Sequence, residues 1–147
     1  MKKVSAIALS TAMALSMALP SNVHATSRVD QLLANMSTRQ KITQMLMVDF
    51  RYWDEDLSDG AQTTGHEFTK MNDQVRKIVE DYDFGALIYF AQNIQETEQS
   101  YNLSMAMQKA ATKDGGIPLL ISADQEGGSV YRLGSGTALP GNMALGA

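Results

Sequence analysis

The stretch IPLLISADQEGGSVYR at residues 117–132 decides the fold of this chain. Its first half is a continuous apolar run without alternation, which is typical of a strand buried on both faces of a parallel sheet. Pro118 fits near the start of such a strand, where no ladder hydrogen bond is lost. Its second half is polar and begins at Asp124, directly after the strand. Parallel α/β sheets place ligand sites at the carboxyl ends of their strands, so this junction is the first candidate site.

Upstream of this strand, helical and apolar segments alternate along the chain. Apolar side chains spaced three and four residues apart predict the helices, and short apolar runs predict the strands. The predicted strands are 45–50, ending near Asp49, then 86–90 and 117–123. The predicted helices are 27–36, a segment that opens with a capping box at Ser37–Gln40, then 68–82 and 96–113. We expect Ile42, Met45 and Leu46 to point inward from the second of these helices.

This alternation predicts an α/β fold with a parallel sheet. The spacing from Ala86 to Ile117 matches one βαβ unit of about 30 residues. A chain of 147 residues is nevertheless too short for a complete (β/α)8 barrel, which needs about 200–250 residues.

The first 25 residues predict a secretory signal peptide. Lys2 and Lys3 precede an apolar segment over 4–19, and small residues at Val23 and Ala25 suit cleavage after Ala25. The alternative is an uncleaved anchor, but this interrupted segment is shorter than the ~20 residues that span a bilayer. We therefore divide the chain into a signal at 1–25 and a domain at 26–147, exported to the periplasm or the extracellular medium.

Composition excludes several classes of protein. Hydrophobic residues make up 44% and charged residues 19%, which is ordinary for a globular domain. A net charge of −4 without a basic run argues against nucleic acid or an anionic membrane as a partner. The absence of cysteine excludes disulfides, thiolate metal sites, a cysteine nucleophile and a lipid-modified cysteine.

The polar half of the opening stretch suits a sugar site. Asp124 can accept hydrogen bonds from a pair of hydroxyls, and Arg132 can donate to sugar oxygens. Gly127 and Gly128 allow a sharp turn that brings both groups to one cleft. The alternative is a tight turn whose polar residues are merely solvated.

Residues 119–132 resemble the signature strand-Asp-Gln-Glu-Gly-Gly-Arg-Val-x-Arg of glycoside hydrolase family 3. Segments 41–48, 84–90 and 137–147 are similar to other parts of the same family domain, in the same order. The resemblance implies the N-terminal part of a (β/α)8 TIM barrel, with about three β/α units present. The Asp-Gln-Glu-Gly-Gly form resembles the β-N-acetylhexosaminidase branch rather than the β-glucosidase branch.

The resemblance also implies site residues. Asp124 and Arg132 would bind the non-reducing sugar, and Glu126 would support them together with Gly127 and Gly128. One position departs from the signature, because a serine stands at residue 129 in place of the family arginine. Asp49, near the end of the first strand, is a secondary candidate for lining the cleft.

The implied activity is retaining hydrolysis that removes terminal β-linked N-acetylglucosamine from peptidoglycan or chitin fragments, without metal or cofactor. The family's aspartate nucleophile and histidine acid/base motifs do not occur in this sequence, so we expect them beyond residue 147 and expect no turnover by this chain alone. The alternatives are a β-glucosidase or β-xylosidase of the same family, or a non-catalytic secreted carbohydrate-binding half-domain.

Other candidates are weaker. We interpret His66 as a solvated loop residue and the acidic run 54–59 as a solvated loop rather than a calcium site. Phe50, Tyr52 and Trp53 suggest a sugar-stacking platform, although packing in the core or at its rim is the favoured interpretation. A strand without its next neighbour leaves an apolar edge, so we expect the isolated 26–147 chain to associate or to be molten.

Overall fold

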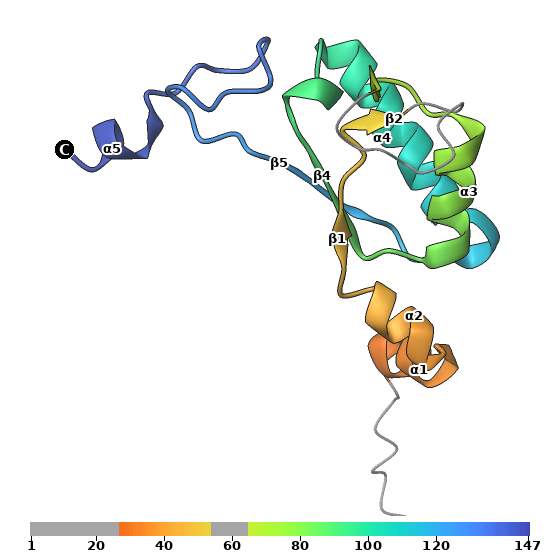
Figure 1. The fold of residues 1–147 in the computed structure, drawn as a ribbon. Coiled ribbons are helices and arrows are strands. Elements are labelled where there is room, and N and C mark those ends of the chain that lie inside the picture. The colour runs from red at the N-terminus through yellow and green to blue at the C-terminus, as the bar shows by residue number, and fades with distance from the viewer. Residues whose placement is uncertain (1–26, 54–64) are drawn as a thin grey trace, which may run out of the picture. The chain divides into compact units, whose positions relative to one another are not determined.

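The computed structural model describes residues 27–53 and 65–147 (Figure 1). The predicted signal peptide and most of the acidic loop, residues 54–64, lie outside the described residues. The chain divides into two compact units, Met1–Asn35 and Met36–Ala147. Within the described ranges, no helix has the length and apolar character needed to cross a membrane.

The first unit contributes one described helix, α1 (Arg28–Asn35). Ser27 begins it, because its hydroxyl accepts from the Asp30 N–H at 3.1 Å. The second unit holds all the other elements: α2 (Thr38–Thr43), β1 (Met47–Val48), β2 (Tyr52–Trp53), β3 (His66–Glu67), α3 (Asp73–Tyr82), β4 (Ala86–Tyr89), η1 (Ala91–Asn93), α4 (Thr97–Ala111), η2 (Lys113–Gly115), β5 (Leu120–Ala123) and α5 (Gly141–Leu145).

The predicted parallel sheet is confirmed. Its strand order is β1-β4-β5, and both pairs run parallel. Val48 pairs with Leu87 in the first pair, and Tyr89 pairs with Ala123 in the second. Because α3 lies between β1 and β4 in sequence and α4 lies between β4 and β5, these helices are the two crossover connections.

The core lies between one face of this sheet and the two crossover helices, which lie side by side (Figure 1). Leu87 and Tyr89 of β4 point to this face and are buried. They meet Val75 from α3 and Leu103 and Met107 from α4, none of which is more than 2% exposed. Burial of these side chains, at about 25 cal/mol per Å² of apolar surface, holds the helices on the sheet.

The opposite face of the sheet carries exposed apolar side chains. Met47 on β1 is 53% exposed and Leu120 on β5 is 74% exposed. The expectation that Ile42, Met45 and Leu46 point inward is wrong, since these side chains are 51%, 78% and 45% exposed. Thr43 is the buried residue of α2, because this helix meets the rest of the unit through polar contacts.

Two neighbouring leucines test this assignment of faces. The buried core predicts cooperative unfolding, whereas the open strand edge predicts a molten or associating chain. Leu119→Glu places a charge at a core side chain that is 5% exposed, so it should abolish any cooperative transition that the wild-type chain shows. Leu120→Glu changes a side chain that is 74% exposed, so it should alter the unfolding free energy by no more than about 0.5 kcal/mol and reduce binding of a hydrophobic dye. Urea titration and dye fluorescence measure both effects. Equal loss of structure in the two variants would contradict the assignment.

Helix α3 starts later than predicted. The apolar spacing placed its beginning at residue 68, but Phe68 is in extended backbone whose N–H donates to the Arg51 carbonyl at 3.0 Å. The helix begins at Asp73, where the Asn72 side chain accepts from the Val75 N–H at 2.8 Å. It ends at Asp83, which adopts a left-handed conformation with φ 51°.

The end of α3 is fastened to α2 and to the next strand. Gln40 donates to the Asp83 carboxylate at 3.0 Å, and Gln44 donates to the Asp83 carbonyl at 2.8 Å. Gly85 passes so close to α2 that a Cβ there would lie 1.9 Å from the Gln44 carbonyl oxygen. Glycine is therefore required at position 85 for this close approach.

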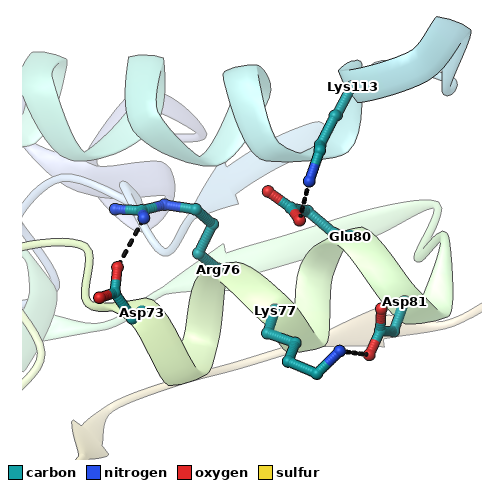
Figure 2. A network of polar contacts seen from close by, with 6 residues as sticks. All are labelled: Asp73, Arg76, Lys77, Glu80, Asp81 and Lys113. Atoms are coloured by element: carbon teal, nitrogen blue, oxygen red, sulfur yellow. Dashed lines mark hydrogen bonds and ion pairs between the residues drawn. The ribbon is translucent and has the colours of Figure 1, made fainter.

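Three ion pairs involve side chains of α3 (Figure 2). Two of them lie within the helix, Asp73–Arg76 and Lys77–Asp81. The third joins Lys113, which follows α4, to Glu80 at 2.5 Å. The hydrogen bond to Glu80 and its negative charge raise the pKa of Lys113.

A small hairpin of β2 and β3 was missed by the sequence analysis. Trp53 pairs with His66 in it, so His66 lies in a strand, exposed, rather than in a loop. Phe50 is buried and packs edge-on against Trp53, with ring centroids 5.9 Å apart. Tyr52 accepts a hydrogen bond from Gln92 at 3.1 Å. These contacts favour packing over a sugar-stacking platform for the three aromatic residues.

Candidate functional site

The carboxyl ends of the three parallel strands meet at one edge of the sheet. Since Tyr89 pairs with Ala123, the residues that follow them, Phe90 and Asp124, lie level at this edge. Asp49 follows β1 at the same edge. Side chains alternate along a strand, so these residues belong to the face opposite Leu87 and Tyr89. The predicted candidates Asp49 and Asp124 therefore reach the same edge from two different strands.

An arginine at this edge was missed by the sequence analysis. Arg51 lies with its guanidinium carbon 3.4 Å from the centre of the Phe90 ring. Its Nε lies 3.3 Å from an Asp49 carboxylate oxygen. Asp49 is thus partly neutralised by a neighbour, and the pair is half-exposed. Arg51 follows β1 by three residues and lies outside any strand, so its spacing along the chain carried no signal for this contact.

A buried asparagine holds this edge together. Asn93 is 1% exposed, and its side-chain amide donates to the Phe50 carbonyl at 2.8 Å and to the Phe68 carbonyl at 2.9 Å. Its side-chain oxygen accepts from the Phe90 N–H at 2.9 Å. One side chain therefore ties together the backbone after β1, after β3 and after β4. It fixes the segments that carry Arg51 and Phe90.

Hydrogen bonds between its own residues close the polar loop that follows β5. The Glu126 N–H donates to the Val130 carbonyl at 2.9 Å, and the Val130 N–H donates to the Gly127 carbonyl at 3.3 Å. The Gln125 side-chain oxygen accepts from the N–H groups of Arg132 at 2.8 Å and Leu133 at 3.1 Å. These bonds bring the backbone of Arg132 back beside the end of β5.

Gly127 is the position where this loop touches the following segment. Its φ is +79°, and a Cβ there would lie 2.7 Å from both the Leu139 carbonyl oxygen and the Gly141 nitrogen. Gly128 also has positive φ, at +58°, but a Cβ there would meet nothing closer than 3.8 Å. Both glycines have the positive φ of a sharp turn, and Gly127 has a close contact in addition.

The predicted sugar-binding pair, Asp124 and Arg132, does not form an ion pair among the described residues. Both residues are partly buried. The Arg132 Nε is buried and has no hydrogen-bond partner among the described residues. An unpaired buried donor costs about 1–3 kcal/mol, so this nitrogen has hydrogen-bonding capacity that the fold does not use.

The remaining candidates are more peripheral. Glu126 takes part in the loop through its N–H, and its side chain is exposed. Ser129, which stands where the family signature has arginine, is exposed at the tip of the loop. Within the described ranges no group of three or more histidine, aspartate or glutamate side chains is arranged to hold a metal ion.

The far side of the loop rests on the start of α4. The hydroxyls of Thr97 and Ser135 are in contact, and the Tyr131 hydroxyl donates to the Gly136 carbonyl at 2.6 Å. A cavity of about 330 Å³ lies between the two segments, lined by Glu96, Thr97 and Leu133 among others. The loop that carries Arg132 is thus supported both at β5 and at α4.

Comparison with known proteins identifies the family. Residues 37–147 match the Glycosyl hydrolase family 3 N terminal domain. The chain is 36% identical over 115 residues to beta-hexosaminidase A of Pseudoalteromonas piscicida, covering 76% of this chain and 19% of that protein. It is 38% identical over 63 residues to a beta-hexosaminidase of Photobacterium profundum, covering 43% of this chain and 18% of that protein.

A solved structure agrees with this match. The chain superposes on the glycoside hydrolase family 3 beta-N-acetylglucosaminidase of Paenibacillus sp. str. FPU-7 with a TM-score of 0.60 and 37% identity, covering 76% of this chain and 18% of that one. The chain thus spans about a fifth of the length of these relatives. Its parallel β1-β4-β5 sheet with crossover helices is part of a TIM-barrel-type fold. This chain therefore belongs to glycosyl hydrolase family 3, and residues 37–147 lie in the N-terminal domain of that family.

Proposed function

We propose that this chain supplies the sugar-binding edge of a β-N-acetylhexosaminidase that removes terminal N-acetylglucosamine from peptidoglycan or chitin fragments. The observation that carries the proposal is that Asp124 and the Arg51–Asp49 pair follow strands of one parallel sheet at its carboxyl edge. The backbone of Arg132 is tied back to Gln125, the residue after Asp124. Ligands bind at this edge in barrels of parallel strands. The names of the similar proteins, beta-hexosaminidase and beta-N-acetylglucosaminidase, support the choice of sugar.

The chemistry of these groups suits a sugar with hydroxyls and an acetamido group. A carboxylate such as Asp124 accepts from two neighbouring hydroxyls, which selects their relative orientation. Arg132 donates through a rigid fork, which suits carbonyl and ring oxygens. Arg51 adds a second cationic donor, held in place by Phe90 and Asp49. The three side chains therefore recognise a sugar without reacting with it.

The reacting groups of the proposed enzyme come from sequence outside this chain. Retaining hydrolysis needs a nucleophile and an acid/base that flank the scissile bond. The family's motifs for both are absent from these 147 residues. We expect this chain alone to bind sugar and to leave an aryl β-N-acetylglucosaminide unhydrolysed, and measurable hydrolysis by the purified chain would contradict this division of roles.

We also propose that the protein is exported. The support is the sequence of residues 1–25, with two lysines, an apolar segment and Ala25 at the expected cleavage point. Expression in a Gram-negative host, followed by mass measurement of the periplasmic fraction, tests it. The expected result is the mass of a chain that begins at Thr26. An intact chain retained in the membrane fraction would overturn the proposal.

Calorimetric titration with N-acetylglucosamine tests the proposed sugar site. We expect saturable binding in the millimolar range, with weaker binding of glucose. Asp124→Asn should weaken binding about tenfold, because the amide still accepts hydrogen bonds but loses the charge, and a charged hydrogen bond exceeds a neutral one by about 1–1.5 kcal/mol.

The matched control is Asp81→Asn, in the exposed Lys77–Asp81 pair of α3, which should leave the affinity unchanged (Figure 2). Absence of binding by the wild-type chain would overturn the proposal. Preference for glucose would replace it with a β-glucosidase or β-xylosidase of the same family.

A further inference from the structure

We propose that Gln125 is a positioning residue for sugar binding, acting through the backbone of Arg132. This inference rests on the proposed function, in which Arg132 contacts the sugar. Gln125 directly follows Asp124, and its side chain reaches across the loop to Arg132. One glutamine therefore sets the separation of the two sugar-binding residues, by a peptide bond on one side and by hydrogen bonds on the other.

The geometry of the contact is specific. The Gln125 side-chain oxygen accepts from two consecutive N–H groups, those of Arg132 at 2.8 Å and Leu133 at 3.1 Å. An amide oxygen has two lone pairs, so this contact uses its full capacity as an acceptor. The inner bond of the loop, from the Glu126 N–H to the Val130 carbonyl, ends two residues short of Arg132. Gln125 thus holds residues 132 and 133, which the backbone bonds within the loop do not reach.

Arg132 depends on this fastening more than most arginines. Its Nε has no hydrogen-bond partner among the described residues, and its side chain makes no ion pair there. No polar contact of the described residues holds its guanidinium, so the position of the backbone decides where the side chain begins. A site gains affinity when its binding groups are held in place before the ligand arrives, since less ordering is needed on binding.

The role requires an acceptor oxygen and nothing else from this side chain. Gln125→Glu keeps an oxygen at the same reach and should preserve both bonds. Gln125→Met keeps the length and removes the acceptor. We expect Gln125→Met to weaken N-acetylglucosamine binding about threefold to tenfold, which corresponds to the net contribution of one or two hydrogen bonds, and Gln125→Glu to stay within about twofold of wild type.

A second glutamine provides a matched control. Gln108 also holds backbone, accepting from the Leu119 N–H at 3.0 Å and donating to the Leu119 carbonyl at 2.8 Å, but it lies on α4 before β5. Gln108→Met should lower the urea midpoint and leave the affinity of the folded chain unchanged. Gln125→Met should leave the urea midpoint unchanged and lower the affinity, because its bonds lie in an exposed loop outside the core.

The experiment combines calorimetric titration of the full chain with amide hydrogen exchange. The Arg132 and Leu133 amides should exchange faster in Gln125→Met than in wild type, and should remain protected in Gln125→Glu. Faster exchange together with weaker binding supports the inference. Unchanged affinity in Gln125→Met, with sugar still bound by wild type, overturns it and leaves the proposed function intact. No sugar binding by wild type overturns the proposed function and this inference with it, whatever the exchange rates show.

Discussion

Asn93→Asp should lower the free energy of unfolding of the domain by about 3 kcal/mol or more, since it leaves two buried carbonyls without donors. The side chain is 1% exposed, and its amide donates to the carbonyls of Phe50 and Phe68. The introduced carboxylate would instead face these two oxygens in a buried site, where its charge is costly. Urea unfolding measures the effect through the fluorescence of Trp53, the only tryptophan, which packs against the same core.

The pH dependence of the unfolding free energy distinguishes the cost of the buried charge in Asn93→Asp from a general loss of packing. Burial raises the pKa of the introduced carboxyl in the folded state, so the folded domain is penalised most above that pKa. As the pH falls the carboxyl takes up a proton and can donate to one carbonyl, so the difference from wild type should shrink. The control is Asn102→Asp, the same change at an exposed position of α4, which should stay within about 0.5 kcal/mol. Equal effects at the two positions would rule out the bridging role of Asn93.

Gly127→Ala should abolish measurable N-acetylglucosamine binding. The added Cβ would lie 2.7 Å from the Leu139 carbonyl oxygen and from the Gly141 nitrogen, and both are backbone atoms that cannot rotate away. Its φ of +79° adds strain for any residue other than glycine. The loop must therefore shift away from the 139–141 segment, and Arg132 shifts with it. Titration calorimetry measures the loss, and circular dichroism checks that the sheet and helices persist.

Gly128→Ala is the matched control for this change. Gly128 also has positive φ, but a Cβ there would meet nothing closer than 3.8 Å. Only conformational strain remains, about 1–2 kcal/mol, and it can be relieved within the exposed turn. We expect binding to weaken by less than about tenfold. If Gly127→Ala bound sugar as well as Gly128→Ala, the close approach of the two segments would not matter for the site.

Several elements were predictable because their signals are local. The capping box at Ser37–Gln40 forms as predicted, with each partner satisfying the backbone N–H of the other. The strands over 86–89 and 120–123 lie inside the predicted runs, since continuous apolar segments of this length are typical of parallel strands. The start of α3 was misplaced because Phe68 continues the helical spacing while its N–H pairs with a distant carbonyl.

The candidate site divides in the same way. Asp124, Gly127, Gly128 and Arg132 lie in one short segment, so the sequence could identify them together. The bridging role of Asn93 was not predicted, because Asn93 contacts Phe50, 43 residues away in sequence. Arg51 was missed because its partner Phe90, which follows β4, lies 39 residues away in sequence. Contacts of this kind leave no periodic pattern in the chain.

Sequence alone was enough to establish the α/β class, the parallel order of elements, the family resemblance and the loop that carries Asp124 and Arg132. These features depend on neighbours within a few residues, whose spacing sets backbone hydrogen bonding and turn geometry directly. Only the tertiary structure decided that Leu119 is buried while Leu120 is exposed, and that Arg51 stacks on Phe90. Burial and side-chain pairing depend on which surfaces meet across the sheet, and that is settled by packing between segments far apart in the chain.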